Sequence, residues 1–256
     1  MSFLAFEFFF RLLWGWNLFL LLISRHESSE KFLRVSFRFS TGFTLVATLA
    51  ALSSPLGPSK AEYAVLFAVW LGAGLYLSVR QTWMRVAGVS LVLLSPLALL
   101  GVKSPLLWLN MLLAALALGG AFGGQFLGHW FLNVPNIHIK EFKRVTQAAV
   151  ASIVLRFAMV LLLALTFQQS NELASGEAFA LKGDGFLGLG SFGLILFASR
   201  IMWGLVAPLI LTIMAKKTVA MRATQSATGI FYANSVLLML GELTALYLEK
   251  ELQWPV

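Results

Sequence analysis

The chain has 256 residues, of which 59% are hydrophobic and 12% are charged, and its formal net charge is +8. A soluble domain carries about 45–50% apolar and about 25% charged residues, so this composition excludes a water-soluble globule. The sequence has no cysteine, which excludes disulfides, thiolate metal sites, iron–sulfur clusters and cysteine nucleophiles within the chain.

Apolar blocks follow one another along the whole chain, and a spanning helix needs about 20 mainly apolar residues. The sequence therefore predicts an all-α fold, a polytopic membrane helix bundle of about eight spans in a single transmembrane domain, residues 1–256. The expected spans are Phe3–Ser24, Phe37–Ser54, Ala61–Val79, Thr82–Gly101, Pro105–Phe131, Phe142–Phe167, Phe186–Ala215 and Ser226–Leu248.

The first and seventh of these spans have features of their own. The first has no basic residue before Arg11, so it lacks the basic start of a secretory signal, and we expect it to be a retained helix. The seventh is long and contains Pro208, which predicts a tilt or a kink.

The basic residues fall on alternate loops, and short cytoplasmic loops are enriched in Lys and Arg. Twelve lie in or beside the odd-numbered loops: Arg25, Lys31, Arg34, Arg38, Arg80, Arg85, Lys140, Lys143, Arg144, Lys216, Lys217 and Arg222. Four lie in the even-numbered loops and the tail: Lys60, Lys103, Lys182 and Lys250. This alternation predicts that both termini lie on the outer, non-cytoplasmic side. It also explains the net charge through topology, so no nucleic-acid partner is expected.

Five ionisable residues stand out away from the cytoplasmic ends of the predicted spans, where an unpaired charge costs several kcal/mol. They are Glu7, Arg11, Arg156, Arg200 and Glu242. Glu7 and Arg11 are four residues apart and share a helix face. At about 1.5 Å per residue, Arg156 lies ~20 Å and Glu242 ~24 Å from the cytoplasmic side, so both are expected near Glu7 and Arg11 in the outer half of the membrane. This intramembrane charge network is either a polar cavity for a proton, ion or quinone headgroup, or a set of structural ion pairs.

The fifth span is rich in small residues and also carries Gln125 and His129 on one face. Gly124 and Gly128 lie in the same stretch and let a helix or a flat ring system approach closely. We therefore predict that these four residues line a pocket, filled by a quinone headgroup or by another helix. A b-type haem on His129 with His26 is less favoured because of their depth, and no ligand set for a metal is evident.

No catalytic constellation is present, so at most this is a subunit of a membrane enzyme complex. The leading interpretation is an integral subunit of a larger, energy-converting or redox complex, with other membrane subunits as partners and a quinone or proton site. The alternative is a stand-alone transporter of a small solute or ion, using Arg156, Arg200 and Glu242. The expected location is a cell membrane, the inner membrane in a bacterium.

Overall fold

The computed structural model describes residues 2–23, 30–52, 60–78, 87–94, 105–133, 139–174 and 191–252. All regular structure in these ranges is helical. The helices are α1 (Ser2–Leu22), α2 (Glu30–Leu52), α3 (Lys60–Ser78), α5 (Pro105–Asn133), α6 (Ile139–Ala174), α7 (Ser191–Ile201), the π-helical turn η2 (Met202–Val206), α8 (Ala207–Ala220) and α9 (Thr224–Leu252). Residues 87–94 are also helical.

Six helices within the described ranges are long and apolar enough to cross a membrane. They cover Leu4–Leu22, Lys31–Leu52, Trp108–Asn133, Ile139–Leu165, Phe192–Ala220 and Thr224–Lys250. The third predicted span corresponds to a shorter apolar helix, Tyr63–Tyr76. Much of the fourth, Thr82–Gly101, lies outside the described residues. The chain is thus a multi-pass helical protein suited to a membrane, and the count of eight spans stays a prediction.

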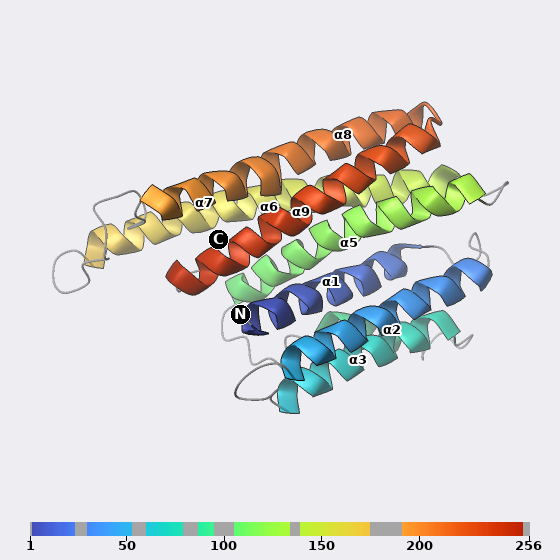
Figure 1. The fold of residues 1–256 in the computed structure, drawn as a ribbon, viewed down its shortest axis with the longest axis horizontal. Helices are drawn as coiled ribbons and strands as arrows, with labels where there is room; N and C mark the ends of the chain where they lie inside the picture. The colour runs from blue at the N-terminus through green and yellow to red at the C-terminus, as the bar shows by residue number, and fades with distance from the viewer. Residues whose placement is uncertain are drawn as a thin grey trace.

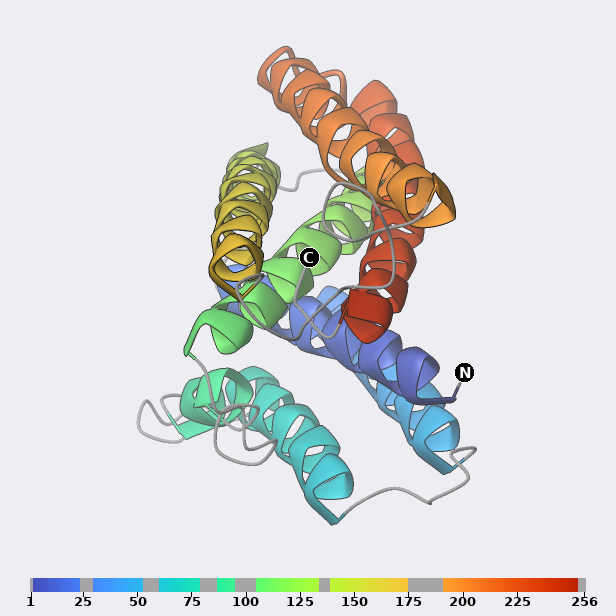
Figure 2. The same cartoon turned by 90° about the vertical axis from the view of Figure 1, so that its left-hand side faces the viewer.

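Helices α1 and α5 form the centre of the bundle, and they separate two groups of helices (Figures 1 and 2). On one side, α1 packs against α2 and α3. On the other side, α5 packs against α6 and α9, and α8 lies against both α6 and α9. The segment 87–94 runs antiparallel to α3, because Gly72 meets Leu91 and Val92 whereas Tyr76 meets Gly88.

The centre is held by the close approach of α1 to α5. A Cβ added at Gly15 would overlap the backbone of Ala115, and one added at Gly119 would overlap the backbone of Gly15. Two helix backbones meet this closely only where side chains are absent. The aromatic residues Trp14 and Trp16 flank Gly15 and are fully buried. Their indole nitrogens donate to the carbonyls of Val92 and Ser36 at 2.8 and 3.1 Å, which ties α1 to the helices on the α2 side.

The two ends of the bundle differ in charge. The start of α1 and the end of α9 lie at the same end (Figure 1), which we name the terminal end. The opposite end carries basic residues from α2, α6, α8 and the turn before α9: Lys31, Arg34, Lys140, Lys143, Arg144, Lys216, Lys217 and Arg222. Arg144 Nη1 donates to the carbonyl of Leu22 at 3.4 Å, which places the start of α6 beside the end of α1. This basic end matches the alternation in the sequence, and the side of the membrane on which it lies stays a prediction.

The long helix predicted to be irregular at Pro208 contains a π-helical turn just before that residue. In an α-helix the carbonyl of Gly204 would accept from the N–H of residue 208, and proline has none. The side chain of Arg200 takes that place, since its Nη1 donates to the Gly204 carbonyl at 3.4 Å. The break therefore ties a buried arginine to the backbone of its own helix.

Candidate functional site

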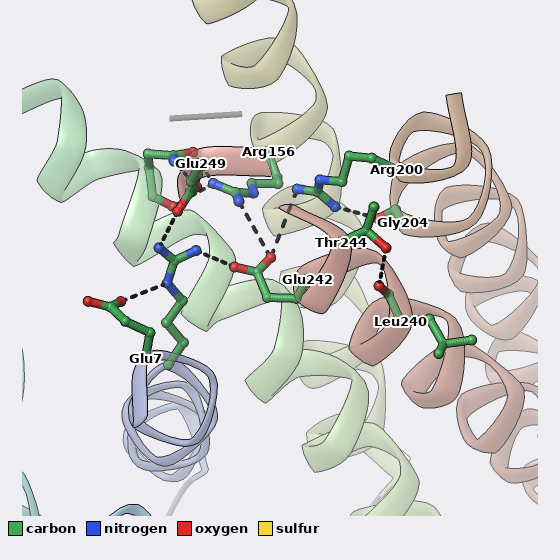
Figure 3. A network of polar contacts seen from close by, with 10 residues as sticks. Glu7, Arg156, Arg200, Gly204, Leu240, Glu242, Thr244 and Glu249 are labelled. Atoms are coloured by element: carbon green, nitrogen blue, oxygen red, sulfur yellow. Dashed lines mark hydrogen bonds and ion pairs between the residues drawn. The ribbon is translucent and has the colours of Figure 1, made fainter. Parts of the chain in front are cut away.

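The terminal half of the bundle contains a buried cluster of charged side chains contributed by four separate helices (Figure 3). Its ionic members are Glu7 and Arg11 on α1, Arg156 on α6, Arg200 on α7, and Glu242 and Glu249 on α9. We call these six residues the charge cluster. Asn110 on α5 joins it through hydrogen bonds.

Glu242 lies at the centre of the charge cluster, and its side chain is 5% exposed. One carboxylate oxygen, Oε1, accepts from Arg11 Nη1. The other, Oε2, lies 3.4 Å from Arg156 Nη2 and 3.9 Å from Arg200 Nη2. Figure 3 shows Arg156 and Arg200 approaching the same oxygen of Glu242 from one side. A single carboxylate is therefore shared by three guanidinium groups.

Arg11 is the best neutralised of the three arginines. Besides Glu242 it contacts Glu249, with Nη2 2.8 Å from Oε2, and Glu7, with Nε 3.6 Å from Oε2. The side chains of Glu7 and Glu249 are 20% and 16% exposed, so they form the edge of the cluster. Three negative charges thus surround Arg11.

Arg156 is tied mainly to α5. Its Nη1 donates to the backbone carbonyl of Asn110 at 2.7 Å and also contacts Asn110 Oδ1. Asn110 Nδ2 in turn donates to Glu249 at 3.2 Å. Arg156 therefore connects α6, α5 and α9, while its only carboxylate within 4 Å in the described chain is Glu242.

Arg200 is the least satisfied member of the cluster, although its side chain is only 1% exposed. Its Nη1 donates to Gly204, and its Nη2 lies beyond hydrogen-bond distance from Glu242. Within the described residues, Nε and Nη2 have no hydrogen-bond partner. Arg200 thus holds a buried positive charge with two donors unused.

Glycines make room for this arginine. A Cβ added at Gly204 would lie 2.5 Å from Arg200 Nη1, and one added at Gly241 would lie 3.4 Å from the same atom. The two glycines also face each other, because a Cβ at Gly241 would overlap the Cα of Gly204. Close packing of α9 against the π-helical turn therefore encloses the guanidinium of Arg200.

The structure brings together all five residues of the predicted intramembrane charge network: Glu7, Arg11, Arg156, Arg200 and Glu242. The prediction missed Glu249, the sixth residue of the charge cluster, and Asn110, which contacts the cluster through hydrogen bonds. Glu249 follows Glu242 by seven residues and so lies on the same face of α9. The predicted span ended at Leu248, one residue too early to include it, whereas α9 continues to Leu252. Asn110 is a lone amide in an apolar helix and has no comparable spacing signal.

The residues predicted to line a pocket on α5 are packed differently from one another. A Cβ at Gly124 would lie 2.5 Å from Phe231, and one at Gly128 would lie 3.1 Å from Phe142. These side chains occupy the space that the two glycines leave. Gln125 is half-buried and His129 is exposed. A quinone at these residues stays a prediction, and this packing adds no support for it.

Polar residues of α9 near the charge cluster lie on two faces. Asn234, eight residues before Glu242, is fully buried and donates to Thr212 of α8 at 3.0 Å, which links α8 and α9. Tyr232 is exposed on the other face. Across the described ranges, no three His, Asp or Glu side chains gather at a spacing that would hold a metal ion.

No protein-family model, curated protein or solved structure matches this chain.

Proposed function

We propose that this protein is a membrane transporter of a small solute or ion, and that the charge cluster is its working site. The observation that carries the proposal is the uneven neutralisation of the buried arginines. Arg156 and Arg200 share one oxygen of Glu242, and Arg200 keeps two unpartnered donors. A cluster built only to fasten helices would gain most by satisfying every buried donor, because an unsatisfied buried polar group costs about 1–3 kcal/mol.

The position of the cluster supports the same function. It lies at the junction of α1, α5, α6, α7 and α9, in the terminal half of a bundle with six candidate spans. Ionisable residues inside membrane helices that face the bundle interior commonly mark solute or ion pathways. The edge residues Glu7 and Glu249 are partly exposed and both contact the buried Arg11.

Flux measurements on the purified protein in liposomes test this function. Electrical currents or radiolabel uptake would be measured after concentration jumps of phosphate, acetate, chloride and protons. We expect a protein-dependent flux of at least one of them, reduced tenfold or more in Arg200→Gln. The exposed variant Lys217→Gln, at the basic end, serves as the control and should keep the wild-type flux. Absence of flux for all four, in protein shown to be folded, would contradict the proposal.

A second candidate is a subunit of a larger membrane complex, energy-converting or redox, with membrane-protein partners. The exposed face of α9 favours it, because Gly229 has nothing within 4 Å of an added Cβ and Ala233 follows four residues later. Small residues at this spacing allow a helix of another chain to approach closely. Native gels would detect the partners, and quinone extraction with an absorption spectrum would detect the predicted cofactor. A single-chain particle without quinone or haem would contradict this candidate.

A further inference from the structure

The guanidinium edge formed by Nε and Nη2 of Arg200 has no hydrogen-bond partner within the described chain, and these are the two nitrogens that point to the same side of the group. That edge binds a carboxylate or a phosphate through two parallel hydrogen bonds. Arginine is suited to such planar oxyanions because its donors are held in a fixed fork and it stays charged. We infer that the charge cluster binds an oxyanion, a carboxylate or phosphate group, at Arg200 with help from Arg156.

Charge balance supports the same assignment. Arg156, Arg200 and Glu242 together carry one net positive charge, since a single carboxylate faces two guanidinium groups. The opposite imbalance exists around Arg11, which faces Glu7 and Glu249 as well as Glu242. The whole cluster is neutral, but its positive surplus lies on the α6 and α7 side. An oxyanion bound there would neutralise that surplus where it is most costly.

The neighbouring arginine of the cluster also has an unpartnered donor. Arg156 Nε is also buried and has no hydrogen-bond partner among the residues that the structure describes. Figure 3 shows the guanidinium groups of Arg156 and Arg200 on the same side of Glu242. Two arginines that approach one carboxylate oxygen are therefore placed to share a second oxyanion.

The backbone around Arg200 is suited to local rearrangement. The π-helical turn Met202–Val206 begins two residues after it, and π-turns inside α-helices occur frequently at functional sites. Arg200 Nη1 donates to the Gly204 carbonyl at 3.4 Å, so the same guanidinium that would bind a ligand through its other edge also contacts this turn. This step deepens the proposed transport function by naming the class of substrate, and it rests on the same cluster.

Thermal unfolding of the full-length protein in detergent tests the inference. Tryptophan fluorescence would follow unfolding in sodium phosphate, sodium acetate and sodium chloride at one ionic strength. A bound ligand raises the unfolding temperature in a saturable way. We expect a saturable rise with phosphate or acetate that exceeds the rise with chloride. Arg200→Gln should abolish it, Arg200→Lys should weaken apparent affinity at least tenfold, and Lys217→Gln should leave it unchanged.

Native mass spectrometry separates a soluble oxyanion from a lipid headgroup. A phospholipid retained by the wild type, lost in Arg200→Gln and kept in Lys217→Gln would assign the phosphate to lipid and support the site. The inference is overturned if no oxyanion raises the unfolding temperature and no phospholipid is lost selectively. It is also overturned if Arg200→Gln and Arg200→Lys both respond as the wild type does. Oxyanion binding without flux would overturn transport alone, whereas flux of protons without oxyanion binding would overturn this inference alone.

Discussion

At the scale of single residues, the charge cluster depends most on Glu242. Its two oxygens contact Arg11, Arg156 and Arg200, so removing its charge leaves three buried cations around a neutral amide. Breaking a buried ion pair by removing one partner costs about 3–5 kcal/mol. The cluster is therefore a point at which one substitution affects several helices.

We predict that Glu242→Gln lowers the free energy of unfolding by about 3–5 kcal/mol. Glu249→Gln is the matched control. The side chain of Glu249 is 16% exposed, and Arg11 is the only arginine within 4 Å of it in the described chain. Its loss should cost less than that of Glu242, because Glu249 faces one arginine whereas Glu242 faces three. Unfolding in detergent, followed by far-UV circular dichroism, measures both. Equal losses in the two variants would show that Glu242 is not the centre.

The sequence identified most of these residues and the pair of Glu7 with Arg11 within one helix, but not the partners that lie on different helices. Ionisable side chains inside apolar spans are rare enough to be noticed, and depth along each helix placed Arg156 and Glu242 near the same level. Which arginine meets which carboxylate depends on how each helix is rotated about its axis, and that rotation is set by packing. Asn110 shows the limit, since a neutral amide is prominent only after Arg156 is seen beside it.

At the scale of secondary-structure elements, small residues decide where helices meet. Gly15 and Gly119 place the backbones of α1 and α5 in contact, and Gly204 and Gly241 do the same for η2 and α9. The sequence predicted close packing at the small residues of the fifth span. It could not distinguish a neighbouring helix from a bound ligand beside Gly124, because either can occupy the space that a glycine leaves.

We predict that Gly119→Ala destabilises the protein by at least about 1–3 kcal/mol, as expected when a methyl group is forced into a packed contact. Gly42→Ala on α2 is the control, since nothing lies within 4 Å of a Cβ added there. Its stability should be unchanged or up to about 1 kcal/mol higher, because alanine favours the helix over glycine. Unfolding curves of the two variants check the contrast, and a tolerated alanine at Gly119 would contradict the close α1–α5 contact.

At the scale of the whole molecule, the separation of charge between the two ends is the strongest regularity. The basic residues near the start of α2, the start of α6 and the end of α8 gather at the end opposite to the start of α1 and the end of α9. Positive residues mark the cytoplasmic side, so the terminal end with the charge cluster is expected to face outward.

The chain has no cysteine, so single cysteines report its topology directly. We predict that Lys250→Cys reacts with an impermeant maleimide added to intact cells, whereas Lys217→Cys reacts only after the membrane is opened. Both substitutions replace a lysine, which makes them matched. The reverse pattern would mean that the basic end faces outward and would contradict the predicted orientation.

The same method decides between six and eight spans. If the segments predicted at Ala61–Val79 and Thr82–Gly101 both cross the membrane, Arg80→Cys lies on the cytoplasmic side and is protected in intact cells. If neither crosses, Arg80→Cys is labelled from outside together with Lys250→Cys. We expect protection, because the alternation of basic loops includes Arg80 and Arg85.

The central claim is that the buried arginines are unevenly neutralised. The most direct test compares the free energy of unfolding of Arg11→Gln and Arg200→Gln, measured without added oxyanion. Arg11→Gln removes the guanidinium that Glu7, Glu242 and Glu249 all contact, and should lower the free energy of unfolding by about 3–5 kcal/mol. Arg200→Gln removes a charge whose nearest carboxylate oxygen is 3.9 Å away, and should leave stability unchanged or raise it. An equally large loss in Arg200→Gln would show that Arg200 fastens the bundle as Arg11 does, and would contradict its assignment to a ligand.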